Sequence, residues 1–197
     1  SKKILSLLIF LIVSLSSIVN VQSIEPDIFV QSTVNRAAKT LSGDFTKSER
    51  IKKLKEIARD TVDIKGIGFY SLGANRKILS DDQLNEYEAL FEKYFLKSFS
   101  SRLAEYSNPE IEINSKKKIN ENYTIVTSTL VSTNSRPEVK IEWRVYTKNP
   151  DNPLIRDLII EGLSLVKTQR AEFASIISSN DGNIEALLKN LSNFVTE

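Results

Sequence analysis

Cysteine and histidine are both absent from the 197-residue sequence. Disulfide bonds are therefore excluded, and so are zinc and copper sites built from the usual thiolate and imidazole ligands. The Ser-His and Cys-His pairs that activate nucleophiles are missing as well, together with the side chain that most often acts as a general base near neutral pH. Most mechanisms of secreted hydrolases are thereby excluded, and we expect neither catalysis nor a metal or other cofactor.

A strong net charge is also missing. The sequence has 27 Lys and Arg residues against 25 Asp and Glu residues. Two of the basic residues, Lys2 and Lys3, precede the one long apolar run, and without them the basic and acidic residues are equal in number. A neutral chain is a poor nucleic-acid binder, so no nucleic-acid partner is expected.

The apolar run extends from Ile4 to Val13 and is followed by a Ser-rich stretch that ends at Ser23. Basic residues, a short apolar segment and small residues in this order are typical of a secretory signal peptide. We expect residues 1–23 to be a signal peptide and residues 24–197 to form one domain that is exported to the periplasm. An uncleaved anchor is the alternative, but a spanning helix needs about 20 mainly apolar residues.

Helical periodicity dominates both ends of the remaining chain. The segment that begins at Thr46 has a capping box with Glu49, and the longest helix begins at Ser80 with a capping box through Gln83. Apolar and aromatic residues recur along one face of this long helix as far as Tyr106. The predicted helices are 26–41, 46–62, 80–106, 163–177 and 184–195, with one further helical turn within 63–73.

Between these helices the periodicity changes to two after Asn108-Pro109. The clearest alternation places Val139, Ile141, Trp143 and Val145 on one face of a strand. Strands are predicted at 110–117, 123–133, 138–148 and 154–161, with turns at 120–122 and 149–153. This order predicts an α+β fold with a four-stranded antiparallel sheet that is covered by helices on one face.

One segment carries a specific family resemblance. Residues 157–173 read Asp-Leu-Ile-Ile-Glu-Gly-Leu-Ser-Leu-Val-Lys-Thr-Gln-Arg-Ala-Glu-Phe, in which an apolar strand passes through Gly162 into an amphipathic helix. This segment resembles the strand-to-helix junction of the MlaC family of periplasmic phospholipid-binding proteins, also known as toluene tolerance proteins. The pattern of 72–106 and the closing Asp181-Gly182 helix are similar to the family as well, whereas Asn75 and Pro153 stand where Trp is common.

The resemblance implies a cone-like fold, akin to nuclear transport factor, with a helical subdomain and an apolar pocket for acyl chains. It implies a phospholipid carrier that maintains outer-membrane lipid asymmetry. Its partners would be the inner-membrane Mla ABC transporter complex and the outer-membrane MlaA lipoprotein–porin complex. We expect the long helix to face Ile141, Trp143 and Val145. The residues expected to bind lipid are Phe69, Leu72, Phe91, Phe95, Phe99, Ile125, Ile141, Trp143, Val145, Leu158, Ile160, Leu163 and Val166.

Other readings of the same residues stay open. An aromatic stripe at helical spacing is usually core, and the apolar groove of a periplasmic chaperone or adaptor would take peptide instead of lipid. A lyase or isomerase on the same fold would use Asp157 as a base with Tyr123 or Tyr146 as a hydrogen-bond donor.

Two further features have both a functional and a structural interpretation. The triplet Lys116–Lys118 is either a site for acidic lipid headgroups or a solvated strand end. Gly66, Gly68 and Gly73 are either hinges that open the pocket or positions of close packing.

Overall fold

The computed structural model describes residues 23–197, so the predicted signal peptide lies, apart from its last residue, outside the described part of the chain. The helices are α1 (Pro26–Ser42), α2 (Lys47–Thr61), α3 (Ile64–Leu72), the 3₁₀ helix η1 (Gly73–Lys77), α4 (Asp81–Leu103), α5 (Leu165–Ser178) and α6 (Ile184–Thr196). No helix of residues 23–197 is both long and apolar enough to cross a bilayer.

Local sequence explains where most helices begin. Thr46 and Glu49 form a reciprocal capping box at α2, and Ser80 and Gln83 form another at α4. Each hydroxyl accepts a hydrogen bond from a backbone N–H that has no partner within the helix. Both predicted capping boxes are therefore confirmed.

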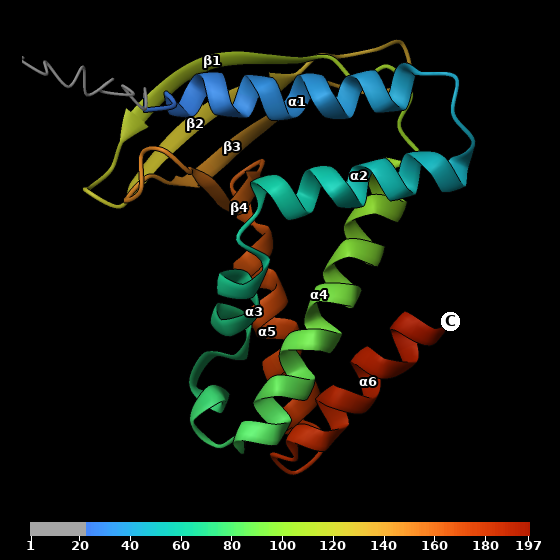
Figure 1. Cartoon of the computed structure of the whole chain (residues 1–197), viewed down its shortest axis with the longest axis vertical. Coiled ribbons are helices and arrows are strands. Elements are labelled where there is room, and N and C mark those ends of the chain that lie inside the picture. Colours follow the sequence, from blue (N-terminus) through green and yellow to red (C-terminus); the bar gives the residue numbers. More distant parts are fainter. Residues whose placement is uncertain (1–22) are drawn as a thin grey trace, which may run out of the picture.

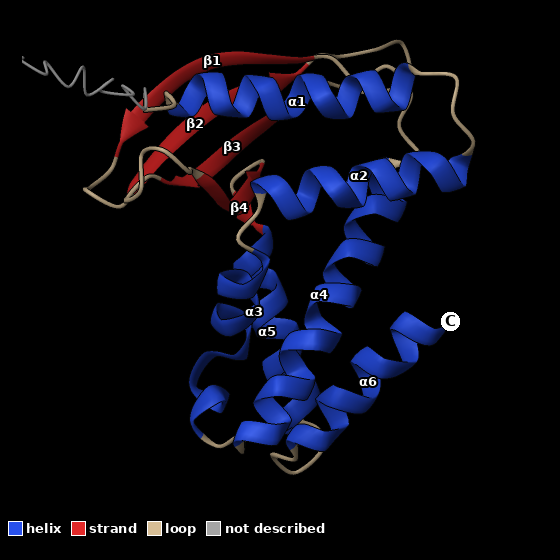
Figure 2. Cartoon of the chain, in the orientation of Figure 1, coloured by secondary structure: helices blue, strands red, loops and turns tan. Residues whose placement is uncertain are grey.

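The sheet has five strands, one more than predicted. They are β1 (Ile111–Lys118), β2 (Tyr123–Leu130), β3 (Val139–Tyr146), β4 (Leu154–Ile160) and β5 (Leu163–Ser164). They are hydrogen-bonded in chain order, and every neighbouring pair is antiparallel. The extra strand, β5, has two residues and follows two residues after β4. Apart from this strand, the predicted α+β fold with an antiparallel meander is confirmed (Figure 2).

The molecule has two bodies with separate apolar cores. In the sheet body, α1 lies along one face of the strands, and in the helical body α3, α4, α5 and α6 pack on one another (Figure 1). Helix α2 lies between the two bodies and contacts both α1 and α4. A small third cluster joins Leu41 of α1 to Leu54 and Ile57 of α2 and to Ala104 at the end of α4.

Candidate functional site

One face of the sheet, here called the inner face, carries a continuous row of apolar side chains. Trp143 of β3 is opposite Leu158 of β4, Ile141 is opposite Ile160, and Ile160 is in turn opposite Leu163 of β5. Side chains of directly opposed residues lie on the same face. The row therefore crosses three strands and ends at the β4–β5 turn.

Exposure to solvent rises along this row. Val145, at one end, is 0% exposed, Trp143 and Ile141 are each 9% exposed, and Leu163, at the other end, is 59% exposed. Leu158 and Ile160 are half-buried. The row is therefore closed at the Val145 end and open to solvent at the Leu163 end.

The polar groups of the inner face are satisfied locally. The indole Nε1 of Trp143 donates a hydrogen bond of 2.8 Å to Ser128 Oγ, and the Ser128 hydroxyl donates one of 2.9 Å to the carbonyl of Ile141. Ser128 is fully buried, so an unpaired hydroxyl there would be costly. Because these two hydrogen bonds satisfy the indole N–H and the Ser128 hydroxyl, the rest of the Trp143 side chain is apolar.

Helix α1 covers the closed end of the row. Val30 and Val34 pack in one cluster with Ile141, Trp143 and Val145. The prediction that the long helix α4 faces these three strand residues is therefore wrong. Val30 and Val34 are four residues apart, about one turn, so both lie on one face of α1. This spacing indicates an apolar helix face but not the element that it packs on.

The aromatic residues of α4 divide between a closed core and a partly open surface. Phe91 is 2% exposed and packs edge-on against Phe173, with ring centroids 6.1 Å apart. Tyr87 lies in the same core, where burial raises the pKa of its hydroxyl, which donates a 2.7 Å hydrogen bond to the Gly68 carbonyl. Phe95 and Phe99 are only half-buried and stack with centroids 5.7 Å apart.

The two apolar cores are not packed into one. Phe95 and Phe99 belong to the cluster of the helical body, whereas Leu158 and Ile160 belong to that of the sheet body. Among residues 23–197, Val62 at the end of α2 is the only side chain that packs against both clusters. Each body thus keeps half-buried apolar side chains that belong to its own cluster alone.

The remaining residues that were expected to bind lipid lie in different environments. Leu72 is fully buried within the helical core, and Val166 of α5 packs against that core. Phe69 is half-buried on α3 beneath the ammonium group of Lys65. Ile125 is opposite Arg144. It therefore lies on the outer face of the sheet, away from Trp143.

Asp157 holds the junction between β4 and α5. Its carboxylate accepts a 2.5 Å hydrogen bond from Ser164 Oγ and a 3.1 Å hydrogen bond from the backbone N–H of Val166. Glu161 and Gly162 make the intervening turn at φ values of 49° and 80°, in the left-handed region that glycine adopts at little cost. Both carboxylate oxygens are thus engaged in holding the turn that carries Leu163.

Tyr123 and Tyr146 lie on the outer face, together with two arginines. Arg156 stacks on the Tyr146 ring, 3.7 Å from its centroid, and donates a hydrogen bond to the Tyr123 hydroxyl at 2.8 Å. The same guanidinium forms a 2.7 Å ion pair with Asp63, which also caps α3. These tyrosines are on the opposite side of the sheet from the apolar row. They contact Arg156, which links β4 to Asp63 at the start of α3.

Two of the candidate hinges, Gly68 and Gly73, and one residue of the lysine triplet, Lys116, have close structural partners. A side chain at Gly68 would meet the Phe91 ring at 2.8 Å, and one at Gly73, where φ is +57°, would meet the Arg170 guanidinium. Lys116 forms ion pairs with Glu25 at 2.6 Å and with Asp27 at 2.8 Å. Close packing therefore accounts for Gly68 and Gly73, and the ion pairs at the start of α1 account for Lys116.

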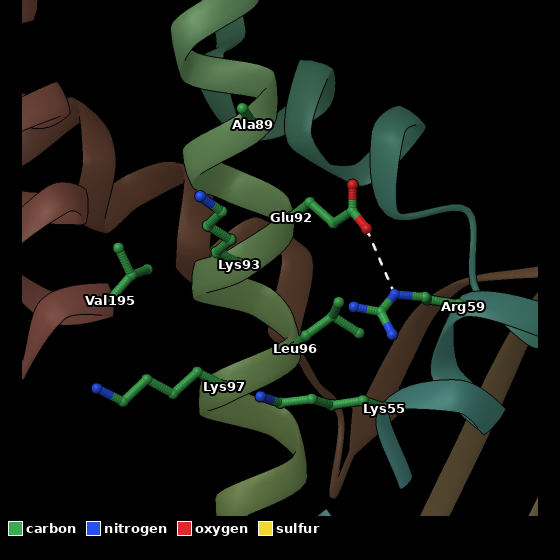
Figure 3. A pocket seen from close by; sticks show the side chains of 8 residues that line it. All are labelled: Lys55, Arg59, Ala89, Glu92, Lys93, Leu96, Lys97 and Val195. Carbon is green, nitrogen blue, oxygen red and sulfur yellow. Dashed lines mark ion pairs between the residues drawn. The ribbon is translucent and has the colours of Figure 1, made fainter. Parts of the chain in front are cut away.

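Two surface hollows lie away from the apolar row. One has a volume of about 360 Å³ and is lined by residues of α2, α4 and α6 (Figure 3). The other, of about 320 Å³, lies between α3 and α4 and includes Phe69. Within residues 23–197, no group of three or more acidic side chains is placed to bind a metal ion.

Comparisons with known proteins agree with this geometry. A structure of a phospholipid-binding protein from Ralstonia solanacearum, in complex with a phospholipid, has a TM-score of 0.73 and is 20% identical. The match covers 88% of this chain and 98% of that chain, and it shows that the two have the same fold. No curated protein matches the sequence. The family model described as MlaC protein matches residues 30–193, so the chain belongs to the MlaC family.

Proposed function

We propose that this protein is a phospholipid carrier that holds acyl chains between its sheet body and its helical body. Two comparisons support the proposal, because the chain belongs to the MlaC family and shares its fold with a protein whose structure contains a phospholipid. The residues proposed to contact the chains are the half-buried Phe95, Phe99, Leu158 and Ile160, the exposed Leu163, and the edges of Ile141 and Trp143, which are each 9% exposed.

The observation that carries the proposal is the separation of the two cores. Half-buried apolar side chains on α4 and on β4 belong to different clusters, and among residues 23–197 only Val62 packs against both. Apolar surface that stays in contact with water costs roughly 25 cal/mol for each Å². A bound acyl chain would cover both surfaces at once and remove this cost.

The transfer energy of the lipid defines what such a carrier has to do. A diacyl phospholipid has roughly 30 methylene groups, and burying each of them contributes ~0.8 kcal/mol, or about 24 kcal/mol together. An unshielded lipid would therefore not cross an aqueous space. The protein has to cover most of both tails while the headgroup stays in water.

The gradient of exposure supports a proposal for the orientation of the bound lipid. The methyl ends of the tails would lie toward Val145, which is fully buried, and the glycerol and headgroup toward Leu163, which is 59% exposed. No charged residue belongs to the apolar row. We therefore expect the protein to select weakly between headgroups.

The cellular role follows from the family. We propose that the carrier works in the periplasm and passes phospholipid between the outer-membrane MlaA lipoprotein–porin complex and the inner-membrane Mla ABC transporter complex. The predicted signal peptide at residues 1–23 supports export. The lyase or isomerase reading has less support, because Asp157 is engaged by Ser164 and Val166 and the two tyrosines lie on the outer face.

Native mass spectrometry of the protein purified from cells, followed by solvent extraction and lipid analysis of the same sample, tests the proposal. We expect one or two glycerophospholipids for each chain in a fixed ratio. An apo mass that persists after incubation with phospholipid vesicles would contradict the carrier function. Bound apolar peptide in place of lipid would favour the chaperone or adaptor reading.

A further inference from the structure

The cleft between α2, α4 and the end of α6 concentrates positive charge. It is lined by four basic residues, Lys55, Arg59, Lys93 and Lys97, and by one acidic residue, Glu92 (Figure 3). Beyond the predicted signal peptide the chain has as many acidic as basic residues. A local excess of three positive charges is therefore a property of this cleft and not of the whole chain.

Internal contacts neutralise only part of this charge. Arg59 and Glu92 form an ion pair with a 3.5 Å distance between Nε and Oε1. Lys97 donates a 2.7 Å hydrogen bond to the Phe194 carbonyl at the end of α6, where the negative end of the helix dipole favours a cation. Within residues 23–197, neither Lys55 nor Lys93 forms an ion pair.

Three apolar residues also line the cleft, and its basic residues are spaced regularly. The apolar residues are Ala89, which is exposed, Val195, which is half-buried, and Leu96, which is buried. Lys55 and Arg59 are one turn apart on α2, and Lys93 and Lys97 are one turn apart on α4, which places each pair about 6 Å apart along its helix. Figure 3 shows Lys55 and Arg59 reaching toward α4 from α2.

We propose that this cleft is a docking groove for an acidic amphipathic helix of a protein partner. Carboxylates four residues apart on such a helix have the same ~6 Å rise as the lysine pairs. They would lie along Lys55 and Arg59 or along Lys93 and Lys97, while a neighbouring apolar side chain would contact Leu96 or Val195. Insertion of one helix into a groove on another protein is a common mode of recognition.

Two other anionic ligands fit the cleft less well. A single phosphate group is compact and needs cations that converge on one point, whereas these cations are spread over two helices. A bilayer with anionic headgroups presents a broad surface, and it would not reach Leu96, which is 3% exposed. The cleft shares no residue with the apolar row of the sheet.

A synthetic probe tests the proposal directly. The probe is a stapled helical peptide of about 15 residues with Glu at every fourth position and Leu between them, and its control has Gln in place of Glu. We expect the Glu peptide to bind, with affinity that falls as salt rises, and to shift the NMR signals of Ala89, Leu96 and Val195. The double variant Lys55→Glu/Lys93→Glu should bind it about tenfold more weakly.

The matched control is Lys148→Glu/Lys167→Glu, which reverses two exposed lysines outside the cleft and should change the affinity by less than about twofold. Equal weakening by both double variants, or equal binding of the Gln peptide, would overturn the proposal. So would shifts of the cleft signals by inorganic phosphate or by phosphatidylglycerol vesicles in the absence of any shift by the peptide. The phospholipid content of the two double variants separates this outcome from failure of the carrier function.

Discussion

The two bodies of this protein differ in how far their apolar side chains are exposed to solvent. The helical body closes its core, with Phe173 and Tyr87 almost fully buried and in edge-on contact at 6.4 Å. The sheet body leaves its apolar row open at one end, where Leu163 is more than half exposed. We expect the closed core to contribute most to the stability of the fold, and we propose that the open row, together with Phe95 and Phe99 of α4, contacts the ligand.

The largest effect is expected for truncation of the closed core. Phe173→Ala removes a ring that is 2% exposed, and such a cavity should lower the free energy of unfolding by ~3–5 kcal/mol. Phe99→Ala removes a half-buried ring and should cost about 1–2 kcal/mol. Urea unfolding of both variants in lipid-free protein measures the difference, and equal losses would show that the surface of α4 at Phe99 is as closed as the core around Phe173.

A second pair of variants separates the two faces of the sheet. Ile160 and Ile125 are both half-buried strand residues, but Ile160 lies on the inner face and Ile125 on the outer face. We expect Ile160→Asn to lower the amount of co-purified phospholipid several-fold, since it places an amide within the apolar row. Ile125→Asn should leave the lipid content unchanged at a similar stability.

Lipid analysis and urea unfolding of the same preparations decide whether the inner face contacts lipid. If both variants lose lipid in proportion to their stability, the inner face is only core. If neither loses lipid, the ligand lies elsewhere.

The smallest effect concerns the edge of the sheet body. The hydrogen bond from Lys116 lowers the pKa of Asp27 below its ordinary value of 3.8, and the hydrogen bonds to Asp27 and Glu25 raise the pKa of Lys116 above 10.5. A lowered carboxyl pKa stabilises the fold above pH 3.8, and this contribution is lost as the pH falls through the folded-state value. A raised lysine pKa stabilises it below pH 10.5, and this is lost as the pH rises.

Lys116→Ala should therefore lower the melting temperature slightly near neutral pH and not at all in strong acid, where Asp27 is protonated. Circular dichroism at a series of pH values measures this dependence. The neighbouring Lys117→Ala is the control, because Lys117 is opposite Ile125 on the outer face and forms no ion pair within residues 23–197. A pH-independent loss in Lys116→Ala would show that the ion pairs contribute nothing.

Local features of the fold could be predicted from the sequence, whereas the partners of each face could not. The capping residues Thr46 and Ser80 specify the starts of α2 and α4, and strict alternation specifies the inner face of β3. These signals involve residues close together in the chain. Which helix covers Trp143 depends on chain reversal over about a hundred residues, and so α4 was expected where α1 lies.

The candidate site divides in the same way. Alternation placed Ile141 and Trp143 on one face of β3, whereas Leu163 was expected in a helix and lies in β5 opposite Ile160. Ile125 has the same apolar character but the opposite parity, and the register with β3 places it outside the row. The helix α3 was expected as one turn but extends from Ile64 to Leu72. It includes Gly66 and Gly68, which pack closely against Asp63 and Phe91.

Photo-crosslinking with a phospholipid that carries a diazirine on one acyl chain tests the central claim most directly. After irradiation and proteolysis, we expect labelled peptides from β3 and β4, at Trp143, Leu158 or Ile160, and from α4, at Phe95 or Phe99. Label on both surfaces of the same protein would place the chain between the two bodies. Label confined to the outer face around Ile125 and Tyr146, or spread evenly over the surface, would contradict the account.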